Sequence, residues 1–180
     1  MGLTMHKTIL NVLAAASGAT LALPSAAQAG GVMGTDAAHC TSGRGPAIQV
    51  NVLDLKDRRG QLKLELYPAT ETDFMRSDTE LLAEGKVFRR VTIDAPVAGQ
   101  VAMCIRVPHP GRYALLLLHS RRAQDKFDVW QDGVGLRSNT RIGRARPSVA
   151  NAAVEVGAGV AVLDIETQYL RGLGGFSPLR

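Results

Sequence analysis

The sequence predicts an all-β fold, a single antiparallel β-sandwich of about seven strands. Segments that alternate apolar and polar residues recur at roughly the 8 to 12 residue spacing of such folds, with Gly- and Pro-containing turns between them. No helical periodicity extends beyond two turns, which argues against a helical core. The length of 180 residues fits one domain.

The N-terminal segment has the layout of a secretory signal peptide. His6 and Lys7 precede an uncharged run that ends at Ala27-Gln28-Ala29, a triplet of the kind that signal peptidase cleaves. Ala, Ser and Gly dilute this run, so we expect cleavage rather than a retained membrane anchor. The mature protein is then periplasmic or extracellular, with no transmembrane span.

The chain is therefore expected to have four parts. They are a signal peptide at 1–29, a flexible leader at 30–46, the β-sandwich domain at 47–170 and a mobile C-terminal tail at 171–180. The tail is Gly-rich, which is typical of a mobile terminus.

The first two strands of the domain are predicted to form a hairpin. Ile48, Val50 and Val52 alternate with polar residues, and Leu62, Leu64 and Leu66 do the same after a polar turn at 56–60. The stretch 68–86 leaves open a short helix around Thr79 to Glu84. A third strand is expected around Val87, Val91 and Ile93, and a fourth from Val101 to Val107.

The run from Tyr113 to Leu118 is apolar on both faces, so it is predicted to be the central buried strand. A short fifth element at 126–130 precedes a loop rich in Gly and Arg that extends to Pro147. Ala150–Val156 and Val160–Tyr169 are expected to form a closing pair of strands around the turn 157–159.

Several motifs carry a resemblance to a known family. Pro110-Gly111-Arg112-Tyr113-Ala114 begins an apolar strand that ends in His119, and Lys126-Phe127-Asp128 follows. Asp132 to Asn139 and Pro147-Ser148 complete the pattern. Together these motifs resemble the bacterial domain-of-unknown-function family DUF2141 over roughly residues 47 to 169.

The resemblance implies an immunoglobulin-like or transthyretin-like sandwich in the cell envelope, and it supplies no catalytic residue. Tyr113, directly after the turn at Gly111, resembles the tyrosine that closes a corner in sandwich folds by bonding back to the chain. Both residues are therefore given structural roles.

The two cysteines, Cys40 and Cys104, are predicted to form a disulfide. Export would place both in an oxidising compartment, and the chain has no other cysteine. The bond would attach the leader to the fourth strand. Alternation along that strand leaves open which of its faces is buried.

We expect no enzyme activity, no metal site and no cofactor. In the family loop, positions where oxygen ligands for calcium are expected hold Ser120, Arg122 and Gln124. The histidines lack the close spacing of zinc ligands, and the sequence has neither a Gly-x-Ser-x-Gly elbow nor a phosphate loop. His119 is interpreted as a hydrogen-bonded core residue, and Trp130 as a core plug rather than an exposed platform.

A cluster of arginines is the remaining candidate site. It comprises Arg137, Arg141, Arg144 and Arg146. These side chains form either a solvated loop or an anion-binding surface for an envelope polyanion. Nucleic acid is not expected as a partner, since no aromatic residues interleave with the arginines.

Two functions remain open. The first is an exported, non-catalytic binding or accessory module that contacts an envelope protein or polyanion. The alternative is a structural or assembly subunit that pairs through an exposed strand edge.

Overall fold

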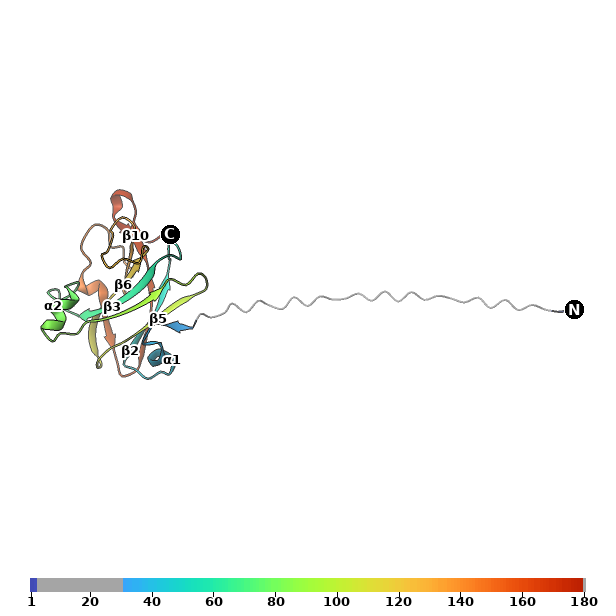
Figure 1. The fold of residues 1–180 in the computed structure, drawn as a ribbon, viewed down its shortest axis with the longest axis horizontal. Coiled ribbons are helices and arrows are strands. Elements are labelled where there is room, and N and C mark those ends of the chain that lie inside the picture. The colour runs from blue at the N-terminus through green and yellow to red at the C-terminus, as the bar shows by residue number, and fades with distance from the viewer. Residues whose placement is uncertain (3–30, 180) are drawn as a thin grey trace.

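The computed structural model describes residues 1–2 and 31–179. The expected signal peptide therefore lies outside the described residues, except for its first two positions. The described chain forms two β-sheets, three short α-helices and one 3-10 turn (Figure 1). In this part of the chain, no helix is long and apolar enough to cross a membrane.

The larger sheet has seven strands, and every pairing in it is antiparallel. Its strands are β3 (Gln61–Pro68), β4 (Arg89–Asp94), β6 (Gly111–Ser120), β7 (Gly133–Leu136), β8 (Ala153–Val156), β10 (Gln168–Leu170) and β11 (Phe176–Ser177). Their order is β11-β10-β7-β6-β3-β4, and β8 also pairs with β6. The apolar strand β6 thus has three partners, which confirms its predicted central place.

The smaller sheet has the order β1-β5-β2-β9. Its strands are β1 (Val32–Met33), β2 (Ala47–Leu53), β5 (Val101–Arg106) and β9 (Val160–Glu166). β2 and β5 are antiparallel, but β1 runs parallel to β5 and β9 runs parallel to β2. The expectation of a wholly antiparallel fold is therefore wrong for this sheet, because alternation shows which face is buried and not the direction of the neighbouring strand.

The two sheets share one core, and the predicted first hairpin is wrong. Side chains of β2 and β3 belong to the same buried cluster, yet these strands lie in different sheets. The polar link between them carries the chain from one sheet to the other. The predicted closing pair divides in the same way, because β8 pairs with β6 and β9 pairs with β2.

The helices are α1 (Ala37–Thr41), α2 (Asp78–Ala83) and α3 (Val149–Ala152), and the 3-10 turn is η1 (Gly172–Gly174). Helix α2 confirms the short helix that the sequence left open. The described part of the expected flexible leader, 31–46, contains β1 and α1. The expected mobile tail contains η1 and β11.

The predicted disulfide between Cys40 and Cys104 is confirmed. It joins α1 to the fully buried Cys104 of β5 across a Cα–Cα distance of 6.0 Å. A second contact holds the same segment, since the buried Asp36 carboxylate accepts hydrogen bonds from the Arg106 N–H and the Arg89 guanidinium, each at 2.8 Å. Besides the pairing of β1 with β5, the disulfide and the Asp36 carboxylate therefore attach the residues before β2 to the smaller sheet.

Candidate binding cleft

The outer face of the larger sheet is covered by loops. Alternation along β3 places Lys63 and Glu65 on the face opposite the core, where a strand of an antiparallel sheet commonly meets water. Both side chains are nevertheless buried. Apolar residues on the same face form a second buried cluster, which includes Tyr67, Leu116 and Val134.

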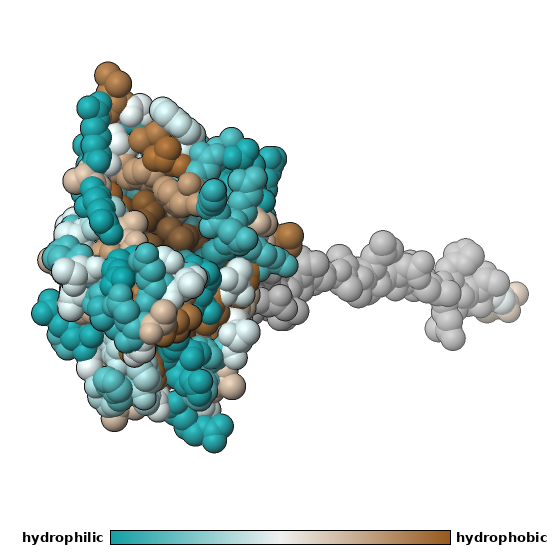
Figure 2. All heavy atoms as spheres, turned by 60° about the vertical axis from the view of Figure 1, so that its left-hand side comes forward, coloured by the Kyte–Doolittle hydropathy of each residue, from teal (hydrophilic) through white to brown (hydrophobic). Residues whose placement is uncertain are grey.

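A cleft of about 460 Å³ opens on this face. Leu116, Leu118 and Val134, from the adjacent strands β6 and β7, form its floor. Its walls come from segments that are distant in sequence and contribute Met75, Phe127, Val129, Ile142, Ala145, Pro147, Leu170 and Phe176. Figure 2 shows an apolar hollow on this side of the molecule, framed by hydrophilic side chains. The lining is mostly apolar, which is typical of small-molecule sites.

One end of the cleft is polar. The Tyr67 hydroxyl donates a hydrogen bond to Glu65 at 2.6 Å, and the Arg90 guanidinium pairs with the same carboxylate at 2.6 Å. Arg90 also bonds Asp78 at 3.0 Å. Burial and the neighbouring Glu65 raise the pKa of Tyr67, so its hydroxyl stays protonated and remains a donor. The charges at this end are paired with one another.

The first wall, residues 121–132, is held by its own polar groups. The buried Asp132 carboxylate accepts the backbone N–H groups of Arg121 and Asp128, both at 2.9 Å. The Lys63 ammonium donates to the carbonyl of Gln124 at 2.9 Å. The predicted fifth element at 126–130 is a series of turns and bends. Trp130 is 78% exposed, so its interpretation as a core plug was wrong.

The second wall, residues 137–148, is anchored by Gln168. This fully buried side chain accepts the Ile142 N–H at 3.0 Å and donates to the Thr140 carbonyl at 2.8 Å. The Arg141 guanidinium donates to the Gly174 carbonyl at 2.9 Å, which ties the same loop to η1. The loop is therefore fixed to the β10–β11 edge of the larger sheet.

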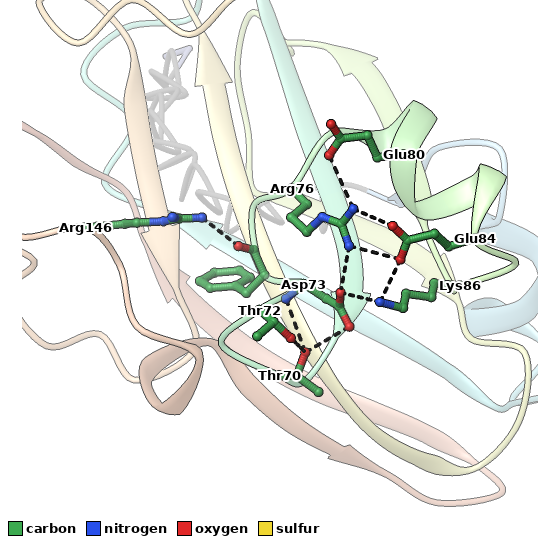
Figure 3. Close-up of polar contacts among 9 residues, drawn as sticks. Thr70, Thr72, Asp73, Arg76, Glu80, Glu84, Lys86 and Arg146 are labelled. Carbon is green, nitrogen blue, oxygen red and sulfur yellow. Dashed lines mark hydrogen bonds and ion pairs between the residues drawn. The ribbon is translucent and has the colours of Figure 1, made fainter.

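A polar network holds the loop that carries Met75. The buried Asp73 carboxylate binds the Lys86 ammonium at 2.7 Å, the Arg76 guanidinium at 3.2 Å and the Thr70 hydroxyl at 2.9 Å (Figure 3). Its hydrogen bond with Lys86 is the main cause that lowers the pKa of Asp73. These contacts connect the loop to the segment that follows α2.

Arg146 joins the network to the second wall. Its guanidinium donates to the Phe74 carbonyl at 2.9 Å, as Figure 3 shows. Arg76 also pairs with Glu84 at 2.6 Å, and Arg76 and Lys86 lower the pKa of Glu84 to about 2. The loop that carries Met75 and the second wall are thus joined by a hydrogen bond.

The four arginines of the predicted anion-binding surface are all exposed. Two of them, Arg141 and Arg146, donate to backbone carbonyls. Arg144 lines the cleft, whereas Arg137 lines a separate hollow beside Glu155. The structure does not gather the four around one site, and their role in anion binding stays a prediction.

Tyr113 and His119 both make hydrogen bonds of the kind that the sequence predicted. The Tyr113 hydroxyl donates to the His109 carbonyl at 2.8 Å, and Gly111 lies in the same turn at the start of β6. His119 is fully buried, with Nδ1 at 2.6 Å from the Tyr169 hydroxyl and Nε2 at 2.8 Å from the Arg59 carbonyl.

The positions considered for calcium have protein partners. The Ser120 hydroxyl bonds the Gln124 carbonyl at 3.0 Å, and Arg122 pairs with Asp128. Among the residues that the structure describes, no group of three or more His, Cys, Asp or Glu is placed to hold a metal ion.

The cleft itself is the feature that sequence reasoning missed. Its floor is part of the apolar run in β6, but its walls depend on Gln168 and Asp132, whose partners are not adjacent in sequence. Comparisons found no matching curated protein and no matching solved structure. A family model described as an uncharacterized protein conserved in bacteria, DUF2141, matches residues 50–163, and the chain therefore belongs to this family.

Proposed function

We propose that this chain is a non-catalytic binding domain of the cell envelope, whose cleft holds an apolar small molecule or the apolar part of an amphiphile. The observation that carries the proposal is the cleft of about 460 Å³ on the outer face of the larger sheet. A volume of this size lies within the range of roughly 300 to 1,000 Å³ that is common for ligand sites.

The lining determines the class of ligand. Leu118, Val134 and Phe176 offer apolar contact, and the polar groups at the far end satisfy one another. An apolar ligand would gain roughly 0.8 kcal/mol for each methylene that it removes from water. Among the polar side chains of the lining, Glu65, Tyr67 and Arg90 already satisfy one another, so a strongly polar ligand would have only Arg144 and Asp125 to bond and would leave its other groups against apolar side chains.

The walls support the proposal because hydrogen bonds within the protein hold them in place. Gln168, Asp132 and Asp73 each fix a different wall through two or more hydrogen bonds. A binding site that is formed in advance loses less conformational entropy when its ligand arrives.

Pairing through a strand edge is the less favoured function. β9 is the long edge strand of the smaller sheet, but the Asn139 side chain already occupies part of its outer edge. Its amide donates to the Asp164 carbonyl at 2.9 Å, and its oxygen accepts the Glu166 N–H at 2.8 Å. An added strand would have to displace Asn139 or pair with only the first half of β9.

We also infer that the two sheets form a sandwich of immunoglobulin-like or transthyretin-like type. Support for this inference comes from the shared core between the sheets and from the bond between Tyr113 and the carbonyl four residues upstream.

Titration with N-phenyl-1-naphthylamine, a neutral apolar fluorophore, tests the proposed function. The natural protein should enhance its fluorescence, and Leu118→Gln should weaken binding about tenfold, which corresponds to roughly 1.4 kcal/mol of lost apolar contact. Ala145→Trp should weaken it too, because Ala145 is an exposed residue of the lining and a larger side chain there fills the cleft from outside the core.

Leu82→Gln is the matched control. Leu82 is a 57% exposed residue of α2 that does not line this cleft, so this variant should bind the fluorophore as the natural protein does. Thermal melting of each variant shows whether it is folded. Unchanged affinity in both cleft variants would contradict the proposal.

A further inference from the structure

Large apolar side chains are exposed beside the cleft. Leu173 is 88% exposed and Trp130 is 78% exposed, and both Phe127 and Val129 are also exposed. None of the four belongs to either buried cluster or packs against one. A cluster of exposed apolar residues on a protein surface marks an interaction site.

These residues come from two segments that the fold places together. β10 runs antiparallel to β7 with Tyr169 opposite Gly133, so the residues after β10 extend alongside those before β7. The rings of Phe127 and Phe176 are 6.0 Å apart. In Figure 1, the segment that contains η1 projects from the top of the molecule. Figure 2 shows apolar side chains at the same end, above the hollow.

The same end carries positive charge without matching carboxylates. Among the residues that the structure describes, neither Lys126 nor Arg144 has a hydrogen-bond or ion-pair partner. Arg141 and Arg171 donate only to backbone carbonyls, which do not neutralise their charge. We call the loop-end surface the set of Phe127, Val129, Trp130 and Leu173 together with Lys126, Arg141, Arg144 and Arg171.

The carboxylates nearby are largely engaged elsewhere. Asp128 pairs with Arg122, and Asp132 is buried and accepts backbone N–H groups. Asp125 is exposed and lies 3.8 Å from the Lys63 ammonium. The loop-end surface therefore combines exposed apolar side chains with a net positive charge.

We propose that the loop-end surface docks on a lipid surface that carries anionic headgroups. Trp130 and Leu173 enter the boundary between headgroups and acyl chains, a region that favours Trp. The cations contact the headgroup phosphates, as basic residues do on interfacial elements. Charge complementarity selects an anionic lipid surface over an uncharged one.

The docking does not require the cleft to bind a ligand. Exposed apolar groups and uncompensated cations suffice for adsorption to a lipid surface. The position of the surface beside the cleft would, however, bring the cleft close to a source of amphiphiles. The two proposals have separate readouts, so either can fail while the other holds.

Trp130 reports directly on the docking, because it is the only tryptophan in the chain. The protein from residue 30 onward, which lacks the expected signal peptide, would be titrated with phosphatidylglycerol vesicles and, in parallel, with phosphatidylcholine vesicles. We expect a blue shift of the Trp130 emission, and quenching by brominated acyl chains, with phosphatidylglycerol only. Added salt should weaken the binding, because exposed charges are screened.

Variants test the two halves of the surface. Leu173→Gln should weaken vesicle binding at least fivefold, and the double variant Lys126→Gln, Arg144→Gln should do the same. Leu82→Gln, an exposed leucine outside the surface, is the matched control and should bind as the natural protein does.

The proposal is overturned if phosphatidylglycerol vesicles leave the Trp130 emission unchanged, or if Leu173→Gln binds as tightly as the natural protein. Equal binding to phosphatidylcholine vesicles would overturn the role given to the cations.

Discussion

His119 and Tyr169 form a buried pair that holds the link between β2 and β3. The Tyr169 hydroxyl accepts the Lys56 N–H at 3.0 Å and donates to His119 Nδ1, while Nε2 of His119 donates to the Arg59 carbonyl. These roles follow from the partners, since a carbonyl can only accept. The sequence predicted that His119 is satisfied in the core. It could not identify Tyr169, which is 50 residues away.

Because His119 is buried, it makes the free energy of unfolding depend on pH. Desolvation lowers the pKa of His119 below its ordinary value of 6.5. The unfolded chain therefore takes up a proton near pH 6.5 that the folded chain resists. The stability that neutral His119 contributes is complete above that pH, and it decreases as the pH falls from 6.5 toward the lower pKa of the folded state.

His119→Phe tests this. The variant leaves the Tyr169 hydroxyl and the Arg59 carbonyl without their partner, so we expect a loss of about 1–3 kcal/mol at pH 8. Between pH 7 and 5, the free energy of unfolding should decline less in the variant than in the natural protein. Urea unfolding at several pH values measures both effects. If the free energy of unfolding changed with pH in the same way in both proteins, His119 would not be the source of the pH dependence.

At the level of single residues, the sequence predicted partners best where they are close in the chain. Tyr113 bonds a carbonyl four residues earlier, within one turn that the Pro and Gly residues mark. Trp130 was interpreted as a core plug, but Asp128 and Asp132 fix the loop that carries it, and the residue is exposed.

At the level of elements, β7 was missed because two of its four residues are glycines. A Cβ atom at Gly133 would lie 2.5 Å from the Tyr169 ring, and one at Gly135 would lie 2.6 Å from Ile165. The strand therefore needs glycine where it packs against these side chains. Glycine has no side chain to alternate, so the period-two pattern that reveals strands is absent.

The disulfide is the element-level contact that the sequence predicted best. Removing it with Cys40→Ser and Cys104→Ser should lower the free energy of unfolding by about 4 kcal/mol in the chain-entropy model, given a separation of 64 residues. Urea unfolding measures the loss. Reductant should destabilise the natural protein to a similar degree and leave the double variant unchanged. Two free thiols in the unreduced, denatured natural protein would show that the bond does not form.

At the level of the whole molecule, local alternation of apolar and polar residues predicted the all-β fold class. It did not predict which strands lie in which sheet. Val50 and Leu64 each lie between polar neighbours, which identifies two strands with one core-facing side. Whether such strands pair side by side or face each other depends on contacts far apart in sequence. The cleft is a feature of the same kind, since its walls come from four separate segments.

The central claim is that the cleft on the outer face of the larger sheet is a binding site for apolar ligands. Amide chemical shifts of the ¹⁵N-labelled protein, recorded during titration with N-phenyl-1-naphthylamine, test it most directly. We predict that the shifts change at Val134, Gly143 and Gly175, in or beside the lining, and not at Val162 on the outer face of β9. Shift changes that gather around Val162, or no changes at a saturating concentration of the fluorophore, would contradict the claim.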